Sequence, residues 1–215
     1  MTIAVIGHGR SPEGQRWGSR IDQCCTVVRM WDWYGWQGVA DYGEKYSYGL
    51  FVLTPKGLSA FTSYHKIVPA RKWLAYLGKP VRGDLPNGVP IEIVDPSPWV
   101  AEAQAMGGAG LSGRLTLTRG FVAAAWALCC TPYPDNVVLV GFDNVKLGIN
   151  QPIEKSFCPE YWKMFNSRFE SKLDKSYPVG HSKTETHDMA VEAPLLFKLA
   201  GDRGLKLDYA EEIWG

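Results

Sequence analysis

The sequence predicts an α/β fold: a Rossmann-like, open and mostly parallel sheet with helices on both faces. Short β-branched apolar runs alternate with helical patterns along the chain, as in sheets built from strand–helix–strand units. Residues 137–142 are apolar without alternation, which is typical of a strand buried on both faces. A similar run, Thr2–Ile6, leads directly into a glycine-rich turn at residues 7–9, which predicts a buried strand ending in a tight turn.

Composition indicates one globular domain spanning residues 1–215. The chain is 46% hydrophobic and 21% charged, which supplies a core and excludes intrinsic disorder. Its 23 basic and 22 acidic side chains give a formal net charge of +1, so no basic excess favours nucleic acid as a partner. No apolar run approaches the roughly 20 residues of a membrane span, and we expect no integral membrane segment.

Cysteine usage and the first residues favour a cytoplasmic protein. The five cysteines are odd in number and have no C-x-x-C spacing, so they fit neither a disulfide framework nor a zinc site. Small buried thiols in a reducing compartment are expected instead. The first residues lack the basic and apolar stretches of a signal peptide.

Further elements follow from apolar periodicity and from turn residues. Ser11 and Pro12, after the first turn, are typical of a helix start with Ser11 as the N-cap. The other predicted strands are Thr26–Met30, Tyr48–Leu53, Ile91–Val94 and residues 137–142. The other predicted helices are residues 69–77, 98–106, 119–130, 161–173 and 187–200.

Two turns have the residue types of an anion-binding site. The first, residues 7–11, places two glycines between a strand and a predicted helix, where backbone N–H groups can approach an anion. The second, at Thr118, Arg119 and Gly120, opens a predicted helix with a hydroxyl, a cation and free amides. Neither spacing is that of a dinucleotide fingerprint or a P-loop. A plain tight turn, and a Thr118 N-cap beside a solvated arginine, explain the same residues.

A histidine–glutamate pair is the third candidate site. His187 and Glu192 stand at the start of a predicted helix, with His181 upstream, and the pKa of histidine suits a general base. A surface helix start with a solvated Glu192 is the alternative. No metal and no cofactor are expected, because the chain lacks Asp-x-Asp and H-E-x-x-H spacing.

Aromatic residues gather in residues 31–36, Trp-Asp-Trp-Tyr-Gly-Trp. The segment predicts either an aromatic core cluster under a loop or a surface that stacks on sugars or bases.

Taken in order along the chain, these pieces resemble motifs of the sialyltransferase family. Four of them resemble the family's long motif, which has glycine, asparagine and then glycine or serine after a strand, followed by Gly…Ile-Asp, by Val-Ile-Arg-x-Asn and by Asp-Val-Gly. They read Val5-Ile6-Gly7-His8-Gly9, Gly18-Ser19-Arg20-Ile21-Asp22, Val27-Val28-Arg29-Met30-Trp31 and Asp41-Tyr42-Gly43-Glu44-Lys45. The family's short motif resembles Thr118-Arg119-Gly120-Phe121 through Leu139-Val140-Gly141-Phe142, and its last motif, His-x4-Glu, resembles His187 to Glu192.

The resemblance implies a glycosyltransferase-A-like variant of the α/β fold and a metal-independent, inverting glycosyltransferase with a CMP-sugar donor. A sugar of the sialic acid or Kdo type would pass to a hydroxyl of a glycan or lipopolysaccharide-type acceptor. His187 would act as general base, His181 would lie near the donor phosphate, and Glu192 would belong to the same catalytic group. The residues implied to bind the donor are Gly7, His8, Gly9, Arg10, Ser11, Thr118, Arg119, Gly120 and Gly141.

Two positions depart from the family's pattern. His8 and Trp31 stand where the family has asparagines, so the nucleotide pocket differs from that of the family. A non-catalytic nucleotide- or glycan-binding module and a nucleotide-sugar hydrolase are therefore the alternative functions.

Overall fold

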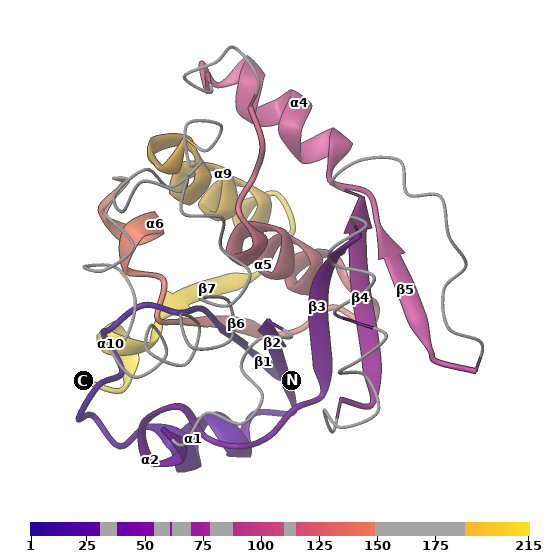
Figure 1. The fold of residues 1–215 in the computed structure, drawn as a ribbon. Helices are drawn as coiled ribbons and strands as arrows, with labels where there is room; N and C mark the ends of the chain where they lie inside the picture. Colours follow the sequence, from indigo (N-terminus) through magenta and orange to yellow (C-terminus); the bar gives the residue numbers. More distant parts are fainter. Residues whose placement is uncertain (31–37, 54–60, 62–69, 78–87, 110–114, 149–187) are drawn as a thin grey trace, which may run out of the picture.

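Seven strands form one sheet in the order β5-β4-β3-β2-β1-β6-β7, and every neighbouring pair is parallel (Figure 1). This computed structural model describes residues 1–30, 38–53, 61, 70–77, 88–109, 115–148 and 188–215. The strands are β1 (Thr2–Ile6), β2 (Thr26–Met30), β3 (Tyr48–Leu53), β4 (Lys72–Leu77), β5 (Ile91–Val94), β6 (Asn136–Val140) and β7 (Lys206–Tyr209). The predicted open α/β sheet is therefore confirmed.

The centre of the sheet is apolar on both faces, as the unbroken apolar runs predict. Val5 in β1 lies between Val28 in β2 and Leu139 in β6, and all three side chains are fully buried. Helices cover both faces of such a sheet, so the strands do not need alternating polar residues.

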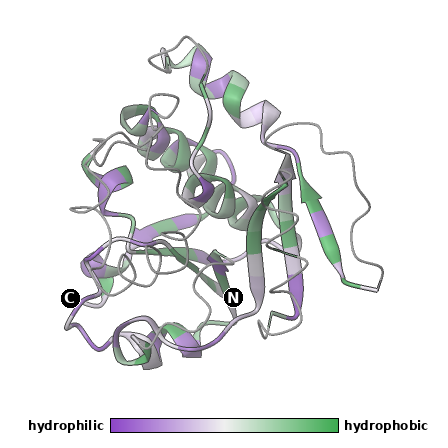
Figure 2. Ribbon diagram, viewed as in Figure 1, coloured by the Kyte–Doolittle hydropathy of each residue, from purple (hydrophilic) through white to green (hydrophobic). Residues whose placement is uncertain are grey.

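Two helices cover one side of the sheet. They are α5 (Arg119–Cys129), which contacts β1, β2, β3 and β6, and α9 (Met189–Gly201), which packs against α5 and β7 (Figure 1). Apolar residues are concentrated in the central strands and in these two helices (Figure 2). A shorter helix, α4 (Ser97–Ala105), packs against α9, where Lys198 pairs with Glu102 at 2.6 Å.

Short helices lie on the opposite side. They are α1 (Gly18–Gln23) and α2 (Val39–Tyr42), which contact each other (Figure 1). The last helix, α10 (Ala210–Ile213), contacts β6 and β7 and is joined to the α1 region because Trp17 packs edge-on against Trp214, with 6.1 Å between ring centroids. A further helix, α6 (Asp143–Leu147), follows β6 directly and packs against α9.

The strand order reverses between β1 and β6. Strands β2 to β5 extend the sheet from one side of β1, whereas β6 and β7 extend it from the other. Open α/β sheets bind ligands outside the carboxyl ends of the strands at such a reversal. In this chain the two segments at that place are the turn after β1, which begins at Gly7, and the turn after β6, which begins at Gly141.

Two predicted elements are wrong. Residues 69–77, predicted as a helix, contain β4, a parallel strand between β3 and β5. Its run Trp-Leu-Ala-Tyr-Leu is apolar throughout, and a run of that length does not distinguish a strand from a buried helix. Ser11 and Pro12 start no helix: residues 11–15 form turns, and the first helix begins at Gly18.

The other predicted elements lie close to their predicted positions. All five strand predictions and the helices at 98–106, 119–130 and 187–200 are confirmed to within a few residues. The sequence reading did not include β7, α1, α2, α6 and α10, and the helix predicted at 161–173 lies outside the described residues. Among the helices that the structure describes, none is long and apolar enough to cross a membrane.

Candidate functional site

The two predicted anion-binding turns meet around the ring of Phe142. A β-carbon at Gly7 would overlap the carbonyl oxygen of Gly141 and would lie 3.1 Å from this ring, so only glycine allows the approach. From the other side, a β-carbon at Gly120 would lie 3.1 Å from the same ring. Turns that are more than 100 residues apart therefore lie side by side at the carboxyl edge of β1 and β6.

The first turn is fixed to the loop after β6 by backbone hydrogen bonds. The N–H of Gly7 donates to the carbonyl of Val140, and the N–H of Gly9 donates to the carbonyl of Gly141, both at 2.8 Å. The Tyr42 hydroxyl, from the end of α2, donates to the carbonyl of Gly9 at 2.6 Å. The path of residues 7–9 is therefore determined by two other segments of the chain.

Asp143 is a residue of this site that the sequence reading missed. Its Oδ2 accepts hydrogen bonds from the backbone N–H groups of Arg10, at 2.5 Å, and Ser11, at 3.0 Å. These are two of the amides that the sequence offers to an anion, and in this structure the anion is the protein's own carboxylate. An acidic residue directly after a buried strand was the available signal.

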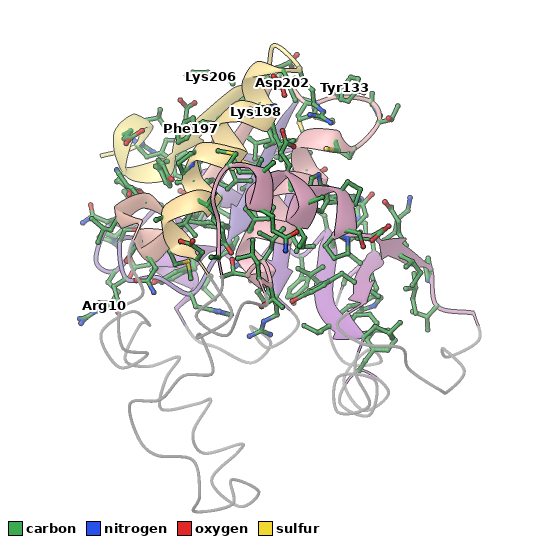
Figure 3. All side chains as sticks on the ribbon, turned by 90° about the horizontal axis from the view of Figure 1, so that it is seen from above. Arg10, Tyr133, Phe197, Lys198, Asp202 and Lys206 are labelled. Atoms are coloured by element: carbon green, nitrogen blue, oxygen red, sulfur yellow. The ribbon has the colours of Figure 1, made fainter. Side chains whose placement is uncertain are left out.

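The remaining residues of the first turn differ in exposure. His8 is buried, with 9% of its surface exposed. The Arg10 side chain points outward from the ribbon (Figure 3), and its guanidinium pairs with Glu13 at 3.1 Å. Arg10 therefore meets solvent at the rim of the site, whereas its backbone amide lies inside it.

The second turn is joined to the predicted histidine–glutamate motif. Oε1 of Glu192, from α9, accepts the backbone N–H of Thr118 at 2.7 Å, and its Oε2 lies 2.6 Å from the Thr118 hydroxyl. Thr118 is also the N-cap of α5, since its hydroxyl accepts the N–H of Phe121 at 3.1 Å. The sequence singled out Thr118 and Glu192 separately, and the structure brings them together.

Glu192 is fully buried, and this burial shifts the pKa of its carboxyl group. Burial disfavours the carboxylate and raises its pKa to about 7, while the hydrogen bonds from Thr118 act in the opposite direction. The expected solvated Glu192 is therefore not what the structure shows. A buried carboxyl group that is half-protonated near neutral pH is a feature of functional sites as well as of structural networks.

Tyr76, near the end of β4, is close enough to Arg119 and Glu192 for their charges to affect the pKa of its phenol. Burial raises the pKa of its phenol to about 12, with Arg119 lowering it and Glu192 raising it by smaller amounts. The carboxyl end of β4, the start of α5 and the first turn of α9 therefore contribute polar groups to one region. Tyr76 belongs to the stretch predicted as a helix, which is why the sequence reading did not place it here.

The remaining pieces of the long motif hold the loops around the first turn. Asp22 accepts the N–H groups of Glu44 and Lys45, at 3.0 and 2.8 Å. Asp41 accepts those of Gly14 and Arg16, at 2.9 and 2.8 Å. The motif carboxylates therefore bind backbone amides and fix the geometry of the α1 and α2 loops.

Several predicted residues lie outside the described residues. They are His181 and His187, together with the aromatic segment at residues 31–36. The fifth cysteine of the sequence, Cys158, also lies outside the described residues. Asp188, which follows His187 in the chain, is the N-cap of α9, and its Oδ1 accepts the N–H of Ala190 at 3.2 Å.

The cysteines and the carboxylates that the structure describes give no sign of a metal centre. In those parts of the chain, no group of three His, Cys, Asp or Glu side chains could hold an ion. The described cysteines are free: Cys24 is buried, Cys129 and Cys130 are half-buried, and Cys25 is exposed, so the expectation of buried thiols holds fully for Cys24 alone. Burial raises the pKa of the Cys24 thiol to about 11, which keeps it protonated.

The fold and site together define the class: an open, all-parallel α/β protein with two loop systems converging at the reversal of strand order. Its structure is similar to "Crystal Structure of a Mammalian Sialyltransferase", with a TM-score of 0.47 and 16% identity over 96% of this chain and 68% of that one. A second crystal structure, of a mammalian sialyltransferase in complex with Gal-beta-1-3GalNAc-ortho-nitrophenol, has the same TM-score and coverage at 17% identity. No protein-family model and no curated protein matches the sequence.

Proposed function

We propose that this protein is an inverting, metal-independent glycosyltransferase. It moves an acidic keto-sugar, of the sialic acid or Kdo type, from a CMP-sugar donor to a hydroxyl of a glycan or lipopolysaccharide-type acceptor. The observation that carries the proposal is the Thr118–Glu192 contact, because it joins the short-motif and last-motif resemblances. Gly120, two residues after Thr118, and Gly7 of the long motif both lie against the ring of Phe142, which brings the third resemblance to the same region. Gly7, Thr118 and Glu192 come from the long, short and last motif, and all belong to this one region of the sheet edge.

The reaction requires a bond to break and a proton to move. The acceptor oxygen attacks the anomeric carbon of the sugar, and the bond from that carbon to the phosphate oxygen breaks, so the electron pair leaves with CMP. In the proposal His187 takes the proton of the attacking hydroxyl, and His181 lies near the leaving phosphate. Backbone N–H donors at the start of α5, beside Arg119, would stabilise the leaving charge.

Glu192 supports the proposed base from a fixed position. It lies five residues after His187 in the sequence, in the first turn of α9, and its two hydrogen bonds to Thr118 tie α9 to the start of α5. The proposal therefore gives Glu192 a positioning role: it holds together the helix that follows the base and the turn that faces the donor.

Ligand binding is the first test of the proposal. CMP at millimolar concentration should raise the melting temperature by several degrees, and the rise should persist in EDTA because no metal takes part. UMP and AMP are the matched controls. An unchanged melting temperature with CMP would contradict the donor assignment.

Transfer is the second test. His187→Ala should abolish sugar transfer while the melting temperature and the CMP response remain, and His65→Ala, a histidine outside the motifs, should leave transfer in place. Binding of CMP without transfer by any variant would favour the non-catalytic module. Release of free sugar at the same rate with and without an acceptor would favour the hydrolase.

A further inference from the structure

Among the residues that the structure describes, two buried polar atoms beside the first turn lack a hydrogen-bond partner. They are Oδ1 of Asp143 and Oγ of Ser11, and neither makes a hydrogen bond in the part of the chain that the structure describes. The two residues are in direct contact, because the Ser11 N–H donates to the other carboxylate oxygen of Asp143. Leaving such atoms buried and unpaired costs free energy, so their presence in a native site calls for a water or a ligand that pairs them.

The surroundings fix where these atoms lie. Asp143 packs so closely on Gly9 that a β-carbon there would lie 2.7 Å from its carboxyl carbon. The carboxylate is held by two backbone amides and cannot turn away without breaking both hydrogen bonds. Oδ1 is therefore a fixed acceptor at the reversal of strand order, between the turns that follow β1 and β6.

The chemistry of the pair selects its ligand. A fixed carboxylate repels a phosphate, and the amides that would attract one are already occupied. Oδ1 of Asp143 needs a donor, whereas the Ser11 hydroxyl can both donate and accept. Two adjacent hydroxyl groups meet both requirements, one donating to Asp143 and the other pairing with Ser11.

The geometry points to a subsite, made by Ser11 and Asp143, for the vicinal hydroxyls of the donor's ribose. This inference rests on the proposed function, and it divides the donor between the two turns. The uncharged nucleoside lies against residues 9–11, and the phosphate and sugar lie toward the start of α5, where Arg119 and the helix amides favour negative charge. The sequence alone offered both turns to the anionic groups of the donor.

Binding of deoxynucleotides to purified protein tests the subsite. Titration calorimetry with CMP, 2′-deoxy-CMP and 3′-deoxy-CMP should show that loss of a hydroxyl weakens binding by about 10-fold, because it leaves a buried acceptor unpaired. In Asp143→Asn the amide oxygen can still accept the two backbone N–H groups, while the free acceptor becomes a donor. In that variant the preference for CMP over its deoxy analogues should fall to about 3-fold or less, because a ribose hydroxyl then pairs with a neutral amide instead of a charged carboxylate. Ser11→Ala should reduce the preference in part.

Asp41→Asn is the matched control. Asp41 also binds two backbone amides of this loop, at Gly14 and Arg16, and it has no unpaired oxygen. This variant should keep the preference for CMP over its deoxy analogues, so a change common to both variants would reflect a loosened loop and would contradict the subsite.

The outcomes separate the inference from the proposed function. If wild-type protein binds CMP and both deoxy analogues equally, the ribose subsite is wrong and the donor assignment stands. If CMP does not bind but AMP or UMP binds with a preference for ribose that Asp143→Asn reduces, the subsite stands and the CMP donor is wrong. If no nucleotide binds, both are overturned.

Discussion

Glu192 combines complete burial with two short hydrogen bonds to one threonine. The arrangement accommodates both protonation states, because the Thr118 hydroxyl can donate to a carboxylate or accept from a carboxylic acid, while its backbone N–H donates in either case. The raised pKa therefore does not require a missing partner. It reflects removal of the carboxylate from water.

The stability of the protein should depend on the ionisation of Glu192. Its pKa is about 7 in the folded chain against 4.5 as the reference, so the folded state binds more protons than the unfolded state between those values. The stabilising contribution is fully present below pH 4.5 and is lost as pH rises through about 7. Relative to Glu192→Gln, the free energy of unfolding of the wild type should fall by on the order of 3 kcal/mol across that range.

Urea denaturation at a series of pH values from 4.5 to 8 measures this effect. The comparison with Glu192→Gln removes the contribution of other titrating groups, because they are common to both proteins. Parallel pH profiles for the two proteins would contradict the assignment of a raised pKa to Glu192.

For single residues, the sequence predicted a role where the residue belongs to a local motif. It did not predict a role that depends on a partner far away in the chain. Thr118 was recognisable as an N-cap, since a hydroxyl before an alanine-rich helix predicts one. For Asp143 the sequence showed only its place after a strand and not its partners, because these are backbone amides 132 and 133 positions earlier in the chain. Contact between residues so far apart follows from the strand order.

Among the elements, β2 carries a buried arginine that supports the first turn. Arg29 is 3% exposed, and its guanidinium donates to the carbonyls of Lys45, at 2.7 Å, and Tyr42, at 2.6 Å. Tyr42 in turn donates its hydroxyl to the carbonyl of Gly9. Burial lowers the pKa of Arg29 to about 10, and the group still remains charged at neutral pH.

Arg29→Lys should therefore lower stability and also weaken nucleotide binding at the proposed donor site. A lysine ammonium lacks the planar fork that reaches two carbonyls, so one buried carbonyl loses a charged donor, and the free energy of unfolding should fall by about 2 kcal/mol. Chemical denaturation and CMP titration measure the two effects. Arg20→Lys is the control, because Arg20 makes one exposed hydrogen bond, to the carbonyl of Trp214. Equal losses in both variants would show that Arg29 has no special role.

The elements predicted correctly are those whose sequence pattern fits only a strand or only a helix. Thr2–Ile6 and Thr26–Met30 are short, β-branched and bounded by turn residues, and both are strands. The helix prediction at residues 69–77 is wrong because five consecutive apolar residues fit a helix as well as a strand. Pairing with β3 and β5 makes this segment a strand. β7 has only four residues, and alternation over so short a run is a weak signal.

For the molecule as a whole, the position of each strand in the sheet determines its resistance to opening. β1 has a hydrogen-bonded neighbour on each side and lies under α5, whereas β5 and β7 form the two edges. Stability is not uniform across such a fold, and opening begins where fewest contacts must break.

Native-state hydrogen exchange should follow this order. The amides of Ala4 and Val5 in β1 should exchange only through global unfolding, and that of Glu92 in β5 should exchange through local opening at a free energy several kcal/mol lower. Mass spectrometry of peptides covering the two strands provides the measurement. Equal protection of both peptides would indicate that the sheet opens as one unit.

At the same scale, alternating strands and helices predict a parallel sheet but not its strand order. The sequence of residues 137–142 does not indicate whether this strand pairs with β1 or with β5. Because it pairs with β1, the strand order reverses between β1 and β6. The position of the site follows from it, because this reversal makes the segments after β1 and β6 neighbours.

Helix α5 gives the site an unexpected sensitivity. Eight consecutive residues, from Phe121 to Leu128, are buried, and four of them are alanines, which allow the helix axis to lie close to the strands. The same helix carries Thr118 and Arg119 at its first turn. Enlarging an alanine such as Ala124, in the interior of the protein, should push the helix away from the sheet and shift Thr118 and Arg119, which belong to the proposed donor site. If the proposed function holds, a screen for altered donor preference should therefore recover substitutions in this interior helix as well as substitutions at the proposed site.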